Sequence, residues 1–120
     1  MAETAVTGKQ GEEIAVRYLK ELGYEIRERN VRLQRYEIDV VAFDRRRKMM
    51  VFVEVKARSH LSPAYPIRTA VDQRKRRALR EAVARWVTAH KYEGPGRIDI
   101  VSVGKGSVVE HIMDLGSDFF

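Results

Sequence analysis

The sequence contains no cysteine, which excludes a disulfide-stabilised scaffold and zinc sites built from thiolates. It has no apolar stretch near the roughly 20 residues that a membrane-spanning helix needs. The first residues, MAETAVTGKQGEE, lack the apolar centre of a signal peptide, so the cytoplasm is the expected location. Repeats, low-complexity tracts and long linkers are also missing from the 120 residues. We therefore expect one domain spanning residues 1–120.

Acidic side chains are fewer than basic ones. The sequence has 17 Asp and Glu and 23 Lys and Arg, which gives a net charge of +6. A basic surface attracts polyanions through electrostatic steering and counterion release. Nucleic acid is the expected partner, and a merely solvated basic surface is the alternative. RKRRALR places positive charge at the start of a helical pattern, where it opposes the helix macrodipole. Arg74, Lys75 and Arg77 are therefore candidate nucleic-acid-binding residues.

The hydrophobic pattern predicts two helices and five strands. Apolar residues recur at helical spacing from about Thr7 to Leu22 and from about Thr69 to His90. Segments rich in β-branched and aromatic residues predict strands at YEIRERNVRL, YEIDVVAF, MMVFVEVKA, RIDIVSV and SVVEHIMDL. The short connectors DRRRK and GKG indicate hairpins. The order αβββαββ predicts an α/β fold in which helices flank a mixed β-sheet.

Both strands of the first predicted hairpin carry charges inside an apolar run. Strand alternation puts Glu54 and Lys56 on one face of MMVFVEVKA. The register that opposes Phe43 to Met50 also opposes Asp39 to Glu54. Two facing carboxylates on a partly buried surface need a proton, a cation or a metal between them.

Two explanations of these charges stay open. Carboxylate oxygens are hard ligands that suit Mg²⁺ or Mn²⁺, and Lys56 could then hold an attacking water or offset charge on a phosphate. The other explanation is a cross-strand ion pair between a lysine and an acid at the strand end. Glu12 is the acid of the first helix that lies nearest its apolar stripe, although acids also favour the first turn of any helix. Arg58 follows the strand closely enough to touch a substrate phosphate.

Five motifs follow one another along most of the chain, and they are GKQGEEIAVRYLKELGY (8–24), EIDVVAFD (37–44), VFVEVKAR (51–58), AVDQRK (70–75) and RIDIVSV (97–103). This ordered set resembles the PD-(D/E)xK nuclease superfamily, which has a restriction-endonuclease-like core. It resembles most closely the YraN-like family, small bacterial proteins similar to archaeal Holliday-junction resolvases.

The resemblance implies a site and an activity. It implies that Asp39 and Glu54 bind the metal, that Lys56 is the catalytic lysine and that Glu12 is a further catalytic acid. The implied activity is endonucleolytic, a metal-dependent hydrolysis of phosphodiester bonds in DNA, branched or structured DNA included. A non-catalytic nucleic-acid-binding module is the alternative, and a basic face that docks an acidic protein is a third reading. Analogy with resolvases suggests a homodimer. Tyr36 stands where the family pattern has glycine, so it either narrows the site or stacks on a base.

Overall fold

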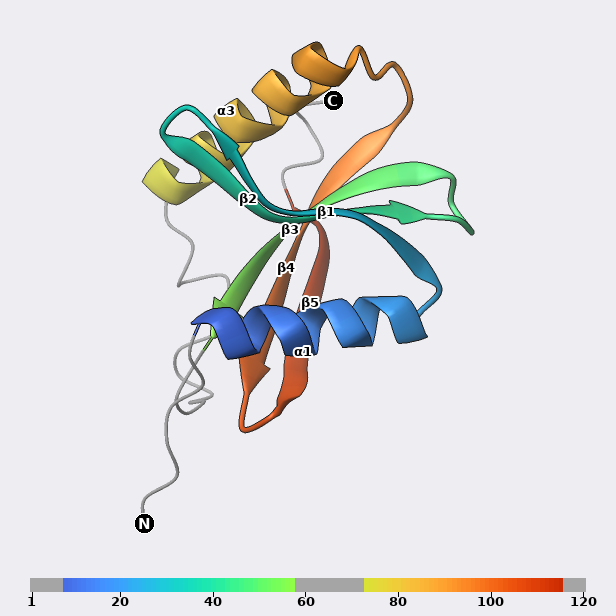
Figure 1. Ribbon diagram of the computed structural model, residues 1–120, viewed down its shortest axis with the longest axis vertical. Coiled ribbons are helices and arrows are strands. Elements are labelled where there is room, and N and C mark those ends of the chain that lie inside the picture. Colours follow the sequence, from blue (N-terminus) through green and yellow to red (C-terminus); the bar gives the residue numbers. More distant parts are fainter. Residues whose placement is uncertain (1–7, 58–72, 116–120) are drawn as a thin grey trace.

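The computed structural model describes residues 8–57 and 73–115 of the chain (Figure 1). Its elements, in chain order, are α1 (Gly8–Glu21), β1 (Tyr24–Leu33), β2 (Tyr36–Asp44), β3 (Met49–Ala57), α3 (Gln73–His90), β4 (Gly96–Gly104) and β5 (Ser107–Leu115). Each predicted strand is present, and YEIRERNVRL forms one strand with an irregularity between Ile26 and Glu28.

The strands form a single mixed sheet in the order β1-β2-β3-β4-β5. All neighbouring strands are antiparallel except β3 and β4, which run parallel. Parallel neighbours need a long crossover connection, and α3 belongs to the segment that joins them. The predicted α/β class and the order αβββαββ are confirmed, and the arrangement is consistent with a restriction-endonuclease-like core.

The two helices end where the backbone enters a left-handed conformation. Gly23 has a φ of 96°, which glycine adopts without strain, so the predicted stop after the first helix is confirmed. At the end of α3, Lys91 has a φ of 52° and Tyr92 N–H bonds to the Val87 carbonyl at 3.0 Å. This is the hydrogen bond of a Schellman motif. The predicted start of that helix at Thr69 lies outside the described residues.

Both predicted hairpins form, and each turn has a local cause. In the β2–β3 turn, the Asp44 carboxylate accepts backbone hydrogen bonds from Arg46 at 3.1 Å and Arg47 at 3.2 Å. In the β4–β5 turn, Lys105 and Gly106 have φ values of 54° and 85°. Two successive positive φ angles match the tight type I′ turn, whose twist suits antiparallel strands.

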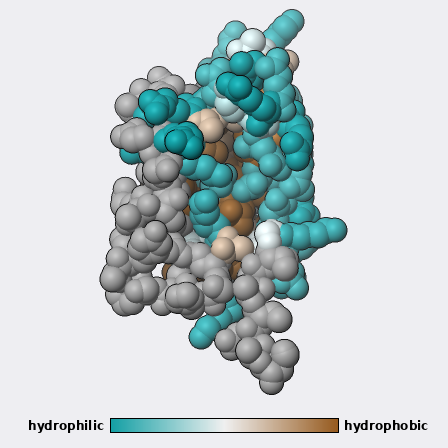
Figure 2. Space-filling model, turned by 90° about the vertical axis from the view of Figure 1, so that its left-hand side faces the viewer, coloured by the Kyte–Doolittle hydropathy of each residue, from teal (hydrophilic) through white to brown (hydrophobic). Residues whose placement is uncertain are grey.

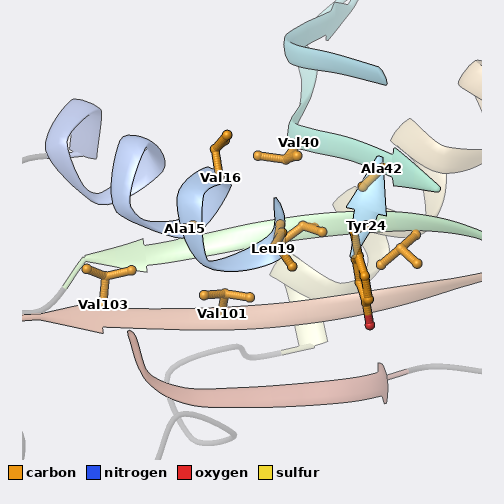
Figure 3. Close-up of a cluster of buried hydrophobic side chains, with 10 residues drawn as sticks. Ala15, Val16, Leu19, Tyr24, Val40, Ala42, Val101 and Val103 are labelled. Atoms are coloured by element: carbon orange, nitrogen blue, oxygen red, sulfur yellow. The ribbon is translucent and has the colours of Figure 1, made fainter. Parts of the chain in front are cut away.

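Apolar side chains form one core on each face of the sheet, and α1 and α3 cover opposite faces (Figure 1). The core under α1 is shown in Figure 3 and consists of Ala15, Val16, Leu19, Tyr24, Val40, Ala42, Val51, Val53, Val101 and Val103. The core under α3 consists of Ile38, Val41, Met50, Phe52, Leu79, Ala82, Val83, Trp86 and Ile98. Because packing on both faces pins the register of β2 and β3, it also positions the acids of these strands.

Candidate active site

The register between β2 and β3 brings the acids of the two strands together. It confirms both predicted apolar pairs, which are Val41 with Phe52 and Phe43 with Met50. The last pair toward the acids is Val40 with Val53, so one further step sets Asp39 beside Glu54. There the Asp39 carboxylate accepts a hydrogen bond from Val55 N–H at 2.8 Å, which holds it against β3.

The surroundings of Asp39 disfavour the charged form of its carboxylate. Burial, and after it the charge of Glu54, raises the pKa of Asp39 to about 7. The Val55 N–H and the Lys75 ammonium lower this pKa and so offset part of the rise. Glu54 is only 7% exposed, so little water reaches the pair. A cation between the carboxylates would stabilise the charged form of both.

Two lysines approach Glu54, and they do so from different elements. Lys75 on α3 places its Nζ 3.1 Å from Glu54 Oε2. Lys56, two residues along β3, places its Nζ 4.0 Å from the same oxygen. The sequence left open a cross-strand ion pair, whereas the ammonium nearest to Glu54 comes from Lys75 on α3, a residue selected from the sequence for binding nucleic acid. The pair does not exclude a metal, because an ammonium and a metal ion compete for the same carboxylate.

A cavity of about 240 Å³ opens over the acids. Its lining comes from β2, β3, α3 and the β1–β2 turn, and consists of Arg35, Tyr36, Glu37, Asp39, Glu54, Lys75, Ala78 and Leu79. The guanidinium carbons of Arg35 and Arg85 lie 5.3 Å and 5.2 Å from the ring centroid of Tyr36, within cation–π range. The cavity thus combines an acidic floor with a cationic and aromatic rim.

Glu12 lies near this pair of acids but contacts a different part of the fold. Its Oε1 is 3.9 Å from Nη2 of Arg29 on β1, and its side chain is 14% exposed. Burial, followed by the charge of Asp39, raises the pKa of Glu12. Over residues 8–57 and 73–115, no three His, Asp or Glu side chains gather closely enough to share a metal. Glu12 is therefore an electrostatic neighbour of the acidic pair, outside the cavity lining.

The remaining candidates divide between α3 and the undescribed segment. Arg74 and Arg77 are exposed in the first turns of α3, on either side of Lys75. Arg58 lies outside the described residues. The coloured residues in Figure 2 are mostly hydrophilic, with a hydrophobic area in the middle of the view. Neither described helix is long and apolar enough to cross a membrane.

A second charged cluster, buried on the α1 side of the sheet, was missed at the level of sequence. Arg97 forms a two-point ion pair with Asp99, at 2.9 Å and 3.2 Å, and reaches Asp44 at 3.1 Å. All three residues are at most 3% exposed. The signal was present in RIDIVSV, where Arg97 and Asp99 alternate with apolar residues just as Glu54 and Lys56 do in β3. Asp99 pairs with Arg97, and Asp44 pairs with both Arg97 and Arg47, so two guanidiniums offset the two carboxylates.

The cluster extends to α1 through a hydrogen-bonded histidine. His111 Nε2 lies 2.8 Å from Asp99 Oδ2, and its Nδ1 lies 2.9 Å from the hydroxyl of Tyr18. Burial raises the pKa of Tyr18, with the charge of Asp99 as the second cause. The hydroxyl therefore keeps its proton at neutral pH. This chain of contacts ties α1 to β4 and β5.

Comparison with known proteins finds a family model and several relatives that match most of this chain. The family model described as "Uncharacterised protein family UPF0102" matches residues 11–103, a range that contains every candidate site residue. A UPF0102 protein of Chlorobium phaeobacteroides (strain BS1) is 38% identical over 97 residues, which cover 80% of this chain and 75% of the relative. A UPF0102 protein of Kosmotoga olearia is 38% identical over 111 residues, covering 91% of both chains. One of Porphyromonas gingivalis (strain W83) is 40% identical over 106 residues, covering 86% of this chain and 74% of the relative.

Proposed function

The chain belongs to the uncharacterised protein family UPF0102, the YraN-like family that its motifs resemble, and from its acidic cavity we propose that it is a divalent-metal-dependent endonuclease acting on DNA. The observation that carries the proposal is the pair Asp39 and Glu54, two largely buried carboxylates side by side at a cavity with a cationic rim. A structural role alone does not explain them, because the buried carboxylates of the Arg97 cluster are matched with guanidiniums and these two are not fully matched.

The donor set fits Mg²⁺ or Mn²⁺. Both ions prefer carboxylate oxygens and complete their shells with waters and substrate phosphates, so two carboxylates at an open cavity suffice. The repulsion that raises the pKa of Asp39 is the kind that a divalent cation relieves. When bound, such an ion polarises a phosphate and lowers the pKa of an attacking water.

The side chains of this protein supply the rest of the chemistry. Asp39 and Glu54 would hold the cation, and the Val55 N–H fixes the position of the Asp39 carboxylate beside Glu54. Lys56 donates a hydrogen bond to the attacking water or to the phosphate oxygen on which charge develops. Glu12, whose pKa is raised by burial and then by the charge of Asp39, orients a water at the β1 side of the acids.

The cationic groups around the cavity bind the flanking phosphates. Arg74 and Arg77 extend from α3 into solvent, where they neutralise phosphate charge without reading sequence. Tyr36 organises Arg35 and Arg85 at the rim, since both guanidiniums lie over its ring. Ordering these arginines is thus a better account of Tyr36 than a bare stacking surface for a base.

The test is cleavage of linear, nicked, flapped and four-way DNA in the presence of Mg²⁺ or Mn²⁺. The wild type is expected to cut at least one of these substrates, and Asp39→Ala, Glu54→Gln and Lys56→Ala to lose most of that activity. Glu93→Gln, an exposed acid after α3, is the matched control and should cut like the wild type. The enzymatic proposal fails if the wild type cuts none of these substrates. It also fails if Asp39→Ala and Lys56→Ala cut them as well as the wild type does.

The runner-up is a nucleic-acid-binding module without catalysis, and the Lys75–Glu54 ion pair favours it because it neutralises one acid without a metal. This function predicts DNA binding that weakens as the salt concentration rises. Divalent ions should then affect binding only through their contribution to ionic strength. Calorimetric titration with Mn²⁺ separates the two functions, because a binding site that disappears in Asp39→Ala belongs to the enzyme. A homodimer stays a prediction for either function.

A further inference from the structure

The Oε2 atom of Glu54 has two lysine neighbours, and Lys56, the lysine of the VFVEVKAR motif, is the more distant one. Lys75 Nζ is 3.1 Å from Glu54 Oε2, whereas Lys56 Nζ is 4.0 Å away. Lys75 also lines the cavity together with Asp39 and Glu54, and Lys56 is not among the residues described as lining it. The ammonium nearest to the Glu54 carboxylate therefore comes from α3.

We propose that Lys75 is an exchangeable counter-ion, which pairs with Glu54 in the metal-free protein and moves to a substrate phosphate when a divalent metal takes its place. The inference rests on the proposed function and adds to it a physical link between metal binding and phosphate binding. The link is a single side chain that cannot serve the carboxylate and the phosphate at once.

The distances favour the exchange. A Mg²⁺ or Mn²⁺ ion binds a carboxylate oxygen at about 2.1 Å. With Lys75 Nζ remaining 3.1 Å from that oxygen, the two cations could be no more than about 5 Å apart. Little water screens them there, because Glu54 is 7% exposed. Repulsion between the cations thus favours departure of the ammonium as the metal enters.

The position of Lys75 allows it to leave. Its side chain is 41% exposed, in contrast to the buried carboxylate it contacts, and a lysine has a flexible four-carbon stem. It stands in the first turns of α3 between Arg74 and Arg77, whose exposed side chains form the proposed phosphate-binding surface. A small rotation of the stem carries the ammonium from the acid to that surface. Metal binding then increases the positive charge available to a phosphate, which is positive coupling between two ligands.

The alternative is a permanent ion pair that helps to hold α3 on the sheet. A permanent pair would give Lys75 the same contact with Glu54 but no role in either binding event. Lys56 provides the internal comparison, because it faces the same oxygen at a longer distance and belongs to the same strand as Glu54.

The experiment is calorimetric titration of the full chain with Mn²⁺, for the wild type, Lys75→Met, Lys75→Arg and the matched control Lys56→Met. Lys75→Met keeps the apolar stem and removes the competing charge, so Mn²⁺ should bind about five- to tenfold more tightly than to the wild type. Lys75→Arg keeps the charge and should stay within about twofold of the wild type. Lys56→Met should change Mn²⁺ affinity less than Lys75→Met does.

A second measurement follows the anisotropy of a fluorescent four-way DNA junction, with and without Ca²⁺ as a divalent probe. Ca²⁺ should strengthen junction binding by a larger factor in the wild type than in Lys75→Met, because only the wild type releases an ammonium. Far-ultraviolet circular dichroism confirms that each variant is folded.

The outcomes separate this inference from the proposed function. If the wild type binds Mn²⁺ and Lys75→Met binds it equally or more weakly, the exchange is refuted and the metal site stands. If Lys56→Met matches or exceeds the effect of Lys75→Met, the exchange is also refuted. If neither the wild type nor any variant binds Mn²⁺, both the exchange and the metal-dependent function fail. Binding that appears only in Lys75→Met supports the exchange and shows that the ammonium blocks the site.

Discussion

Replacing Asp39 with asparagine should make the protein more stable at alkaline pH, although it removes a proposed metal ligand. Asparagine is nearly isosteric and its side-chain oxygen can still accept the Val55 N–H bond. What it removes is a negative charge next to Glu54 in a largely buried site. The change therefore isolates the cost of that charge.

The size and sign of the effect follow from the pKa of Asp39. Asp39 releases its proton near the ordinary value of 3.8 when unfolded and near a pKa of about 7 when folded. Between these values the folded state binds more protons, so Asp39 lowers stability progressively as the pH rises from 3.8 to about 7, and by a constant amount above that. Each pKa unit corresponds to about 1.4 kcal/mol, so the difference between 3.8 and about 7 lowers the free energy of unfolding by ~4 kcal/mol in full. Of this loss, ~3 kcal/mol develops above pH 5.

The assay is urea unfolding in the absence of divalent ions, followed by the fluorescence of Trp86, which is 3% exposed and is the single tryptophan of the chain. We expect the stability of Asp39→Asn relative to the wild type to increase by about 3 kcal/mol between pH 5 and pH 8. Glu93→Gln is the control and should follow the wild type at both values. Equal pH dependence of Asp39→Asn and the wild type, or a variant less stable than the wild type at pH 8, would refute the reasoning.

The remaining predictions concern the metal, the buried cluster and the rim. At pH 8, Mn²⁺ at about 100 times its dissociation constant should stabilise the wild type by about 2.7 kcal/mol against urea and leave Asp39→Asn unchanged. Asp44→Asn should destabilise the protein by about 1–3 kcal/mol at pH 7, because Arg97 and Arg47 lose a charged acceptor. Since these partners lower the pKa of Asp44, the deficit seen in urea unfolding should shrink as the pH falls below about 4. Tyr36→Gly, which restores the residue of the family pattern, should weaken junction binding and reduce its salt dependence in anisotropy titrations, because Arg35 and Arg85 lose the ring that orders them. Unchanged binding by Tyr36→Gly would remove the rim from the proposed interface.

The central pair of the candidate site was predictable because the interactions that bring it together are local. Strand alternation has a period of two residues, and a hairpin joins its strands through a short turn. Once Phe43 is matched with Met50, no freedom is left for Asp39 and Glu54, since a slip of one residue would send the two acids to opposite faces of the sheet and break up the apolar pairs. Lys56 follows from the same alternation.

The buried Arg97 cluster shows where such reasoning stops. The alternation of Arg97 with Asp99 is as visible in RIDIVSV as that of Glu54 with Lys56 in VFVEVKAR. Neighbouring elements decide whether such buried charges meet partners of opposite charge, as in the Arg97 cluster, or a second like charge, as at Asp39 and Glu54. Asp44 reaches Arg97 from β2, which β3 separates from β4 in the sheet, so only the tertiary structure brings this carboxylate to the guanidinium. His111 reaches Asp99 from the neighbouring strand β5.

The sequence by itself determined the elements, the hairpins and the facing acids, because periodicity and short turns act over a few residues. The tertiary structure alone decided that Lys75 reaches Glu54 more closely than Lys56, that Glu12 lies beside the acids rather than in the cavity, and that Arg35 and Arg85 gather on Tyr36. These contacts depend on how α1 and α3 pack across opposite faces of the sheet. That packing is set by the shape of two whole cores, which no short segment of sequence contains.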